Sequence, residues 1–335
     1  MTIRTSAVRH DGNAGTRSEG SPPSRDRRQQ SVPRRRGRIG RDRAAYAYIA
    51  PYFIIFGAFA LFPLVYTLWI SLYEFRLGSD KVWVGFDNFT WLLSNPDFYN
   101  ALTKTFTIGV ISTVPQLLLA LGLAHMLNYR LRVRMFFRIS MILPYATSVA
   151  AATLIFAQIF ASDGGFANWT LSWFGIDAID WRNGNWTAQI AISLIVIWHW
   201  TGYNALIYLA GMQTISYDLY ESAALDGANK WQQFRYITLP GLRPTILFTI
   251  VVSTIGATQL FAEPLLFGGG LPSGGSLNQY QTIGLYLYQQ GWQFGELGRA
   301  AAVAWVTFLL IVVLVVVNTA LVRWRTGERT TGESR

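Results

Sequence analysis

Side chains that could take part in chemistry are few in this 335-residue chain, and they lie far apart. Cysteine is absent, which excludes a thiolate metal site and a cysteine nucleophile. The histidines, His10, His125 and His199, fall in separate stretches, and no Gly-x-x-x-x-Gly-Lys-Ser/Thr motif could hold a nucleotide phosphate. We interpret His199 as a neutral imidazole bonded to a neighbouring helix. The sequence therefore predicts no catalytic residue, no metal and no cofactor, so that energy must come from a partner.

Two polar stripes within apolar stretches are the best candidates for a binding surface. Trp200 and Asn204 are four residues apart in one stretch, and Gln259 and Glu263 are four apart in another, so each pair is expected on one helix face. A sugar needs such a surface, because its C–H face stacks on aromatic rings while its hydroxyls require hydrogen bonds. We predict that these four side chains line a substrate pathway. Other stripe residues fit this pathway and helix packing equally well: Ser193, Thr249, Ser253 and Gly256.

A polar segment at residues 217–240 separates the two stretches that carry the stripes. Ser216 can cap a short helix, which Gly227 can end by adopting the left-handed conformation. Asn229 and Gln232 have the spacing of a capping box that starts a second turn, and the Leu-Pro pair is expected to close the unit. On these grounds alone, the segment is equally well a capped loop between two membrane helices or a docking element.

The composition indicates that most of the chain lies in lipid, since 51% of its residues are hydrophobic and only 14% are charged. We expect an all-α, polytopic membrane domain over residues 45–323, with a disordered basic tail at 1–44 and a short tail at 324–335. Its six transmembrane helices correspond to apolar stretches long enough to cross a core of about 30 Å. They lie at residues 45–73, 101–127, 137–161, 188–212, 244–266 and 298–322.

The distribution of Lys and Arg predicts the orientation in the membrane. The net charge of +10 does not indicate nucleic acid, because 12 of the 28 Lys and Arg residues lie within residues 1–45. The connections after the second and fourth spans and the C-terminal tail are rich in Arg or Lys, whereas the other three connections contain only Arg76, Lys81 and Arg182. The positive-inside rule then places both termini and the polar segment in the cytoplasm. We interpret the Arg-rich run at residues 34–38 as a topology determinant.

The polar segment also carries a motif whose members are Glu221, Ser222, Ala223, Gly227, Ile237, Leu239 and Pro240. It resembles the EAA loop of permease subunits of binding-protein-dependent ABC importers. The family motif reads EAA, three residues, G, nine residues, I, one residue, LP, and only Ser222 departs from it, replacing the first alanine. The resemblance implies that the loop at 213–242 couples the spans to an ATP-binding subunit through these seven residues and Asp226.

The similarity to these permeases extends over nearly everything after residue 45. Val84–Phe89, Gly165-x-x-Asn168 and Thr282–Tyr288 all look like the sugar-importing branch, which has maltose-like and lactose-like members. Gln259–Gly270 departs from many members and looks most like permeases for cellobiose and other β-glucosides. The resemblance implies the type I permease fold, a second related permease subunit, two cytoplasmic ATP-binding subunits and an extracytoplasmic solute-binding protein.

Two other classes of membrane protein remain open at this point. An ion-coupled secondary transporter would need inverted repeats and a carboxylate near the middle of the bilayer, whereas Glu263 lies near the end of its span. An integral-membrane glycosyltransferase would need acidic residues clustered at one membrane face, but the external acids are spread over separate loops. We therefore expect an inner-membrane permease subunit of an ATP-driven sugar importer. The sequence predicts neither the sugar nor the identity of the partner subunits.

Overall fold

The computed structural model describes residues 38–128 and 134–326, and the side chains of 46–128 and 135–320. The expected tails lie outside the described residues up to residue 37 and from residue 327. Contacts divide the chain into two units, Met1–Phe56 and Gly57–Arg335. The described residues are α-helical, with three short π turns and one two-stranded ribbon.

The first unit contains α1 (Arg38–Phe56), which begins seven residues before the expected boundary at residue 45. Its side chains from Tyr46 onward are almost all exposed, although most of them are large and apolar. Pro51 lies inside this helix. The apolar stretch continues along the chain, and Tyr46–Ser71 is long and hydrophobic enough to cross a membrane. Such a helix hides its hydrophobic surface in lipid or against another membrane protein.

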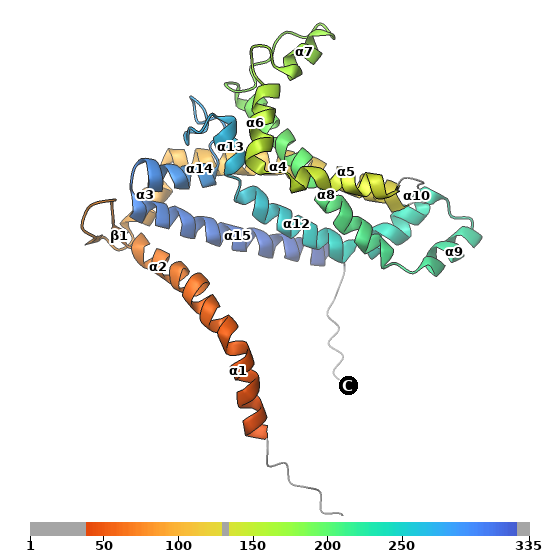
Figure 1. Ribbon diagram of the computed structural model, residues 1–335, viewed down its shortest axis with the longest axis horizontal. Coiled ribbons are helices and arrows are strands. Elements are labelled where there is room, and N and C mark those ends of the chain that lie inside the picture. The colour runs from red at the N-terminus through yellow and green to blue at the C-terminus, as the bar shows by residue number, and fades with distance from the viewer. Residues whose placement is uncertain (1–37, 129–133, 327–335) are drawn as a thin grey trace, which may run out of the picture. The chain divides into compact units, whose positions relative to one another are not determined.

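The second unit begins with η1 (Gly57–Leu61) and α2 (Phe62–Ser71). A small antiparallel ribbon follows, in which β1 (Tyr73–Glu74) pairs with β2 (Val82–Trp83). Then α3 (Asp87–Ser94) leads into the long helix α4 (Pro96–Asn128). In Figure 1 the ribbon, α3 and α14 lie at one end of the long helices, and α9 and α10 lie at the other.

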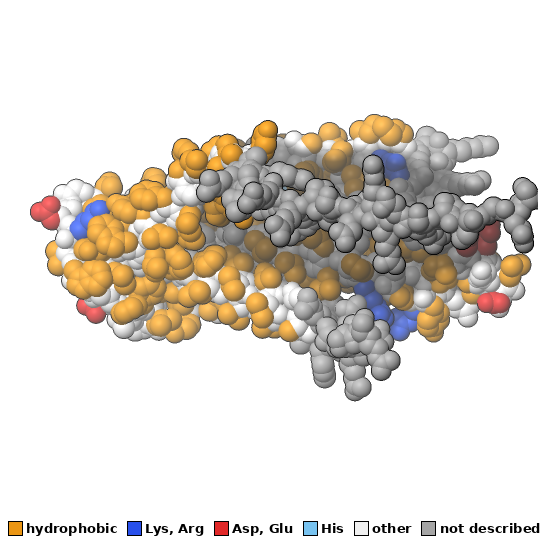
Figure 2. Space-filling model, turned by 90° about the horizontal axis from the view of Figure 1, so that it is seen from below, with side chains coloured by type: hydrophobic (Ala, Val, Ile, Leu, Met, Phe, Trp, Pro, Cys, Tyr) orange, Lys and Arg blue, Asp and Glu red, His pale blue; other side chains and the backbone are white. Residues whose placement is uncertain are grey.

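The long helices α4, α8 (Asn185–Gln213), α12 (Arg243–Thr258) and α15 (Leu297–Thr326) form the core of this unit. Small residues line the contact between α4 and α8, such as Ala120 and Ala124 against Ala205. They allow the two backbones to approach closely, which is how helices associate in lipid. Hydrophobic side chains cover most of the described surface on the face drawn in Figure 2, as expected for a protein that lipid surrounds.

Shorter elements connect these helices and cluster at their ends. They are α5 (Arg134–Ala146), α6 (Val149–Ile159), α7 (Phe166–Ser172), α9 (Tyr217–Leu225), α10 (Lys230–Gln233), η2 (Phe234–Thr238), α11 (Leu239–Gly241), α13 (Ala262–Phe267), α14 (Ile283–Tyr288) and η3 (Gln289–Gln293).

The expected third span is not one straight helix, because α5 and α6 meet at an angle of 92°. Pro144 lies near the end of α5, where its ring removes one backbone donor and obstructs the preceding turn. Both the amide and the hydroxyl of Thr147 then donate to the Pro144 carbonyl oxygen, which satisfies the broken end. Four described helices could cross a membrane singly, and the total is six if each of two bent pairs counts as one span.

A close contact between α8 and α5 tests this packing. A methyl group added at Gly202 would come within 1.7 Å of the Met141 carbonyl oxygen, so Gly202→Ala must push α5 away. We expect this variant to lose about 1–3 kcal/mol of stability through overpacking. The measurement is the apparent melting temperature of the purified protein in detergent at one scan rate.

The matched control is Gly122→Ala on α4, where the added methyl group would meet nothing within 4 Å. It should melt at or slightly above the temperature of the parent protein, because alanine is the better helix former. Equal melting of the two variants would contradict the close contact between α5 and α8.

Candidate functional site

The helix α9, which carries Glu221, is closed at its C-terminal end by the predicted glycine. Gly227 has φ +81°, a conformation that residues with a Cβ rarely adopt. Its amide donates to the Ala224 carbonyl at 3.1 Å, and the Ala228 amide donates to the Ala223 carbonyl at 2.8 Å. This pair of hydrogen bonds is a Schellman motif, so the prediction for Gly227 is confirmed. Ser216 occupies the N-cap position, but its side chain makes no capping hydrogen bond.

The predicted capping box is also confirmed. The Gln232 amide donates to the Asn229 side chain at 2.9 Å, and the Asn229 amide donates to the Gln232 side chain at 2.7 Å. The prediction that Leu239-Pro240 closes the unit is wrong, because the helix continues through η2 and α11. Pro240 lies in the first turn of α11, where its missing N–H removes no required bond. The chain instead turns by 66° before α12.

Side-chain hydrogen bonds connect α9 to η2 and α10 to the loop that precedes it. The hydroxyls of Tyr220 and Thr238 share a hydrogen bond of 2.9 Å, which joins α9 to η2. Gln233 is buried, and its side-chain amide donates to the Ala228 carbonyl at 3.1 Å. The ring of Phe234 lies 4.5 Å from that of His125 on α4. The segment between α8 and α12 is thus one connected piece.

Glu221 is placed where a partner could reach it. Its side chain is exposed, and no ion pair joins it to another residue that the structure describes. It lies on the wall of a cavity of about 620 Å³ between α9 and the inner ends of α4 and α8. Ser222 and Asp226 are exposed beside it, while Ala223 and Ile237 are half-buried. This arrangement presents Glu221 on a capped helix, with the exposed carboxylates of Asp218 and Asp226 close to it in sequence.

The predicted pathway residues of α8 lie in an aromatic cluster. The Trp200 ring contacts Tyr145 at 5.4 Å and Tyr203 at 5.9 Å, and these two tyrosine rings stack at 4.6 Å. Asn204 is buried one turn further on. Sequence reasoning missed both tyrosines. Tyr203 could have been found, since it lies three residues after Trp200, whereas Tyr145 comes from α5 and reaches the cluster through the fold alone.

Two other stripe residues contact neighbouring helices. Thr249 shares a hydrogen bond of 2.7 Å with the Tyr208 hydroxyl, which joins α12 to α8. The Ser193 hydroxyl donates to the Ile108 carbonyl of α4 at 3.5 Å. Both side chains are almost fully buried, so their contacts fit helix packing. His199 is likewise buried and lies among aromatic rings.

Gln259 and Glu263 do not share a helix face, contrary to the prediction. α12 ends at Thr258, Gln259 caps it and is exposed, and Glu263 is buried in the separate helix α13. The break has an identifiable cause. Thr282 donates its hydroxyl to the Leu260 carbonyl at 2.7 Å, so a residue distant in sequence takes the acceptor that a continuing helix would use.

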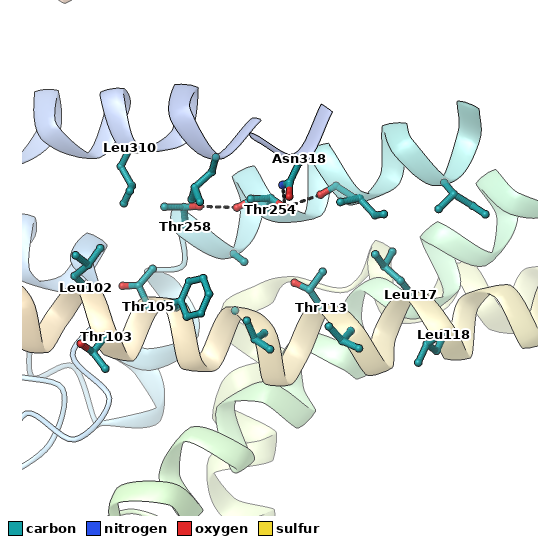
Figure 3. A pocket seen from close by; sticks show the side chains of 18 of the residues that line it. Leu102, Thr103, Thr105, Thr113, Leu117, Leu118, Thr254, Thr258, Leu310 and Asn318 are labelled. Carbon is teal, nitrogen blue, oxygen red and sulfur yellow. Dashed lines mark hydrogen bonds between the residues drawn. The ribbon is translucent and has the colours of Figure 1, made fainter. Parts of the chain in front are cut away.

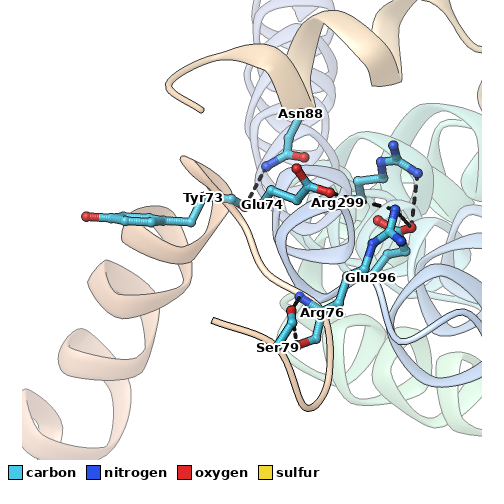
Figure 4. A network of polar contacts seen from close by, with 7 residues as sticks. All are labelled: Tyr73, Glu74, Arg76, Ser79, Asn88, Glu296 and Arg299. Atoms are coloured by element: carbon cyan, nitrogen blue, oxygen red, sulfur yellow. Dashed lines mark hydrogen bonds and ion pairs between the residues drawn. The ribbon is translucent and has the colours of Figure 1, made fainter. Parts of the chain in front are cut away.

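Two of the motifs along the chain position the loops at the ends of the helices. Asn88 donates to the carbonyls of Ser71 and Tyr73 at 2.8 and 2.9 Å, which holds the ribbon against α3. Glu296 bridges Arg76 at 2.9 Å and Arg299 at 3.3 Å in the same network (Figure 4). These residues connect the first ribbon strand to the start of α15.

The loop between α7 and α8 depends on Asn168 in a similar way. Its side-chain oxygen accepts from the amide of Ile179 and the indole of Trp181, and its amide donates to the Ser162 and Ile179 carbonyls. Hydrogen bonds from the backbone and side chain of Asn183 lower the pKa of the Asp180 carboxyl. Asp180 is therefore a charged acceptor that holds this loop, and it is no candidate for proton transfer.

A cavity of about 850 Å³ lies between α4, α12 and α15. Figure 3 shows side chains of α4 facing those of α12 and α15 across it. Its lining is apolar apart from threonines and Asn318, whose amide donates to the Thr254 hydroxyl at 3.0 Å. Such a lining offers few partners for sugar hydroxyls.

Residues 116–327 match the family described as "Binding-protein-dependent transport system inner membrane component". The chain belongs to this family. It is therefore a multi-pass component of the inner membrane, a transport permease and not an enzyme. Membership excludes the ion-coupled transporter and the glycosyltransferase that the sequence alone left open.

Similar proteins include the lactose transport system permease protein LacF of Rhizobium radiobacter, which is 36% identical over 80% of this chain and 90% of its own. The arabinooligosaccharides transport system permease protein AraP of Bacillus subtilis is also 36% identical, over 82% of this chain and 86% of its own. A solved bacterial alginate ABC transporter, in complex with alginate pentasaccharide-bound periplasmic protein, aligns with a TM-score of 0.74 and 25% identity. That alignment covers 86% of this chain and 96% of the other.

The bond between Tyr220 and Thr238 can be tested by a double-mutant cycle. Tyr220→Phe and Thr238→Val each remove one hydroxyl of the pair, so the double variant should cost little more than either single one. We expect each to weaken the attachment of α9 by about 1 kcal/mol. The measurement is hydrogen exchange of the α9 amides, which should speed up about fivefold.

Tyr217→Phe is the control, because this exposed tyrosine on the same helix makes no described side-chain hydrogen bond. It should exchange like the parent protein. Additive effects of Tyr220→Phe and Thr238→Val would show that the two hydroxyls do not interact.

Proposed function

We propose that this chain is a permease subunit of an ATP-driven importer for a sugar or oligosaccharide. The observation that carries the proposal is Glu221, exposed on a capped helix that a side-chain hydrogen bond connects to η2, which leads towards α12. The names of related permeases support the substrate class, since they specify lactose, arabinooligosaccharides, and trehalose and maltose.

ATP-driven import requires partner subunits, because this chain has no nucleotide-binding motif. We infer a second, related permease subunit, two cytoplasmic ATP-binding subunits and an extracytoplasmic solute-binding protein. The alginate transporter that this chain resembles was solved with a periplasmic protein bound to its saccharide. The solute-binding protein delivers the sugar, and the ATP-binding subunits supply the energy.

The coupling mechanism follows from the connections around α9. Closure of the ATP-binding subunits moves α9 through Glu221 and its neighbours. Because the Tyr220 and Thr238 hydroxyls are bonded, this movement passes to η2 and then, beyond the 66° turn, to α12. The bond between Tyr208 and Thr249 carries it on to α8. Such a chain of contacts shifts α8 and α12 together between outward and inward access.

We further propose that Trp200, Asn204, Gln259 and Glu263 line the route of the sugar. Trp200 lies in an aromatic cluster that offers ring faces for stacking. Gln259 is exposed at the end of α12 and has an amide for hydroxyl groups. Asn204 and Glu263 are buried in the isolated chain, so their part in the route requires α8 and α13 to shift during transport.

The orientation of the chain is part of the proposal. The charge distribution places α9, α10 and both termini in the cytoplasm, and α3, α7 and the segment before α14 outside. This puts Glu221 on the side where ATP is found.

Charge reversal at Glu221 tests the docking role. Glu221→Lys should weaken association with the ATP-binding subunits about tenfold or more, because it places a cation on the docking face. The measurement is co-purification of the complex and its ATP hydrolysis in the presence of sugar-loaded binding protein. Asp87→Lys is the control, since Asp87 is also exposed but lies in α3 at the opposite end. If the Glu221→Lys complex assembles and hydrolyses ATP normally, the segment at residues 217–240 only connects two spans and does not dock the ATP-binding subunit.

Cysteine labelling tests the orientation, and the absence of native cysteine makes it clean. Single cysteines at Ser94, Ser172 and Ser276, all exposed, should react with a membrane-impermeant maleimide added to intact cells. A cysteine at Ser216, exposed before α9, should react only after the cells are opened. Labelling of Ser216→Cys in intact cells would reverse the orientation.

A further inference from the structure

Three aromatic rings form a continuous strip just beyond the end of α12. The Phe261 ring contacts Tyr288 at 5.2 Å, and the Tyr288 and Trp292 rings lie 6.0 Å apart with only 9° between their planes. Phe261 and Tyr288 are half-buried, whereas Trp292 is 76% exposed. We refer to Phe261, Tyr288 and Trp292 as the aromatic strip.

The strip is held by a rigid support. Thr282 caps α14 and donates its hydroxyl to the Leu260 carbonyl, so α14 is fixed next to Phe261. Gly284 allows this approach, because a methyl group there would lie 2.9 Å from the Leu260 carbonyl oxygen. The π turn η3 continues α14, and the nearly parallel rings of Tyr288 and Trp292 come from these two successive elements.

An oriented amide lies next to the strip. Gln281 is only 1% exposed, and its Nε2 donates to the Gln289 Oε1 at 2.6 Å. That bond uses the acceptor of Gln289, while no described residue accepts from its Nε2. The buried Oε1 of Gln281 also lacks a partner among the described residues. Gln289 follows Tyr288 in sequence and is half-buried, and its bond with Gln281 orients an amide whose Nε2 donor has no described acceptor.

We propose that the aromatic strip is a saccharide-binding subsite on the external side of the permease, where sugar rings stack on Tyr288 and Trp292 and a hydroxyl accepts from Gln289. This inference rests on the proposed function of sugar import. It extends the route outward from Gln259, which is exposed two residues before Phe261.

The surroundings of the strip favour a sugar over a lipid headgroup. The side chains that flank the rings in sequence are the amides of Gln289, Gln290 and Gln293. Anchors at a membrane surface commonly combine Trp with Lys or Arg, but the nearby Arg299 is already paired with Glu296 and lies over the Trp91 ring at 4.3 Å. Neutral amides beside aromatic faces match the mixed apolar and hydroxylated surface of a sugar.

Protection of a single cysteine tests binding directly. Gln293→Cys, next to Trp292, is introduced into the full complex in nanodiscs, and its alkylation by an impermeant maleimide is timed with and without lactose, arabinotriose or maltotriose. The sugar that the complex transports should slow alkylation about threefold or more. Adding Trp292→Ala should abolish this protection, and adding Trp292→Phe should keep it, since the aromatic face remains.

Transport provides the second measurement. With sugar-loaded binding protein, Trp292→Ala and Tyr288→Ala should each lower transport per assembled complex about threefold to tenfold, the size expected from losing one aromatic contact. Trp173→Ala is the matched control, because Trp173 is also an exposed tryptophan, 69% accessible, in a different external segment. It should transport like the parent complex.

The possible results separate the two proposals. If the parent complex transports one of these sugars but the sugar does not protect Gln293→Cys, or Trp292→Ala transports normally, the subsite is wrong and sugar import stands. Equal losses in Trp292→Ala and Trp292→Phe, with lower melting temperatures, would make Trp292 a membrane anchor instead. A parent complex that transports no saccharide at all would contradict sugar import itself, and the strip would then lose its ligand.

Discussion

Hydrocarbon contains no water to bond a free backbone N–H or C=O, and this constraint governs the whole architecture. The long helices satisfy these groups internally, and at several helix breaks a side chain satisfies them instead. Thr147 donates to the Pro144 carbonyl at the corner between α5 and α6. Thr282 donates to the Leu260 carbonyl beyond α12, and Asn88 donates to the Ser71 carbonyl beyond α2. Each of these residues determines where a span ends and where the next element can start.

Hydrogen bonds between side-chain hydroxyls also join neighbouring helices of the permease to one another. Tyr220 with Thr238 and Tyr208 with Thr249 join α9 to η2 and α8 to α12. The bond between Tyr208 and Thr249 is buried between helices, where an unsatisfied partner is costly, and the bond between Tyr220 and Thr238 is partly buried. In the proposed coupling, a displacement of α9 would therefore move α8 and α12 together. The small residues between α4 and α8 keep the remaining contact close.

Local signals in the sequence predicted the elements whose causes are local. The capping box at Asn229 and the left-handed Gly227 depend on neighbours a few positions away, and the structure has both. The apolar stretches likewise coincide with helices, four of which could cross a membrane singly, although α1 begins earlier than expected. The prediction failed where the cause is distant. Thr282 ends the segment after α12 from 22 positions away, and periodicity within a span contains no trace of that contact.

The residues of the candidate site also divide into those that local spacing predicts and those that only the fold brings together. Trp200 and Asn204 were predicted together because they share one face of α8. Tyr145 contacts Trp200 only because α5 folds against α8. Gln259 and Glu263 were paired by spacing alone, and the break between α12 and α13 separates them. No pattern in the sequence indicated a role for Gln289 or Trp292, because a π turn and the buried Gln281 create their environment.

The π turn η2, between the docking segment and α12, has a geometric consequence. A π turn holds one more residue than an α turn with the same backbone bonds satisfied. If the extra residue migrated along the helix, every side chain it passed would rotate by about 100° around the axis, since an α-helix has 3.6 residues per turn. In the proposed coupling, η2 is therefore the place where a displacement of α9 would become a rotation of the helix that leads to α12.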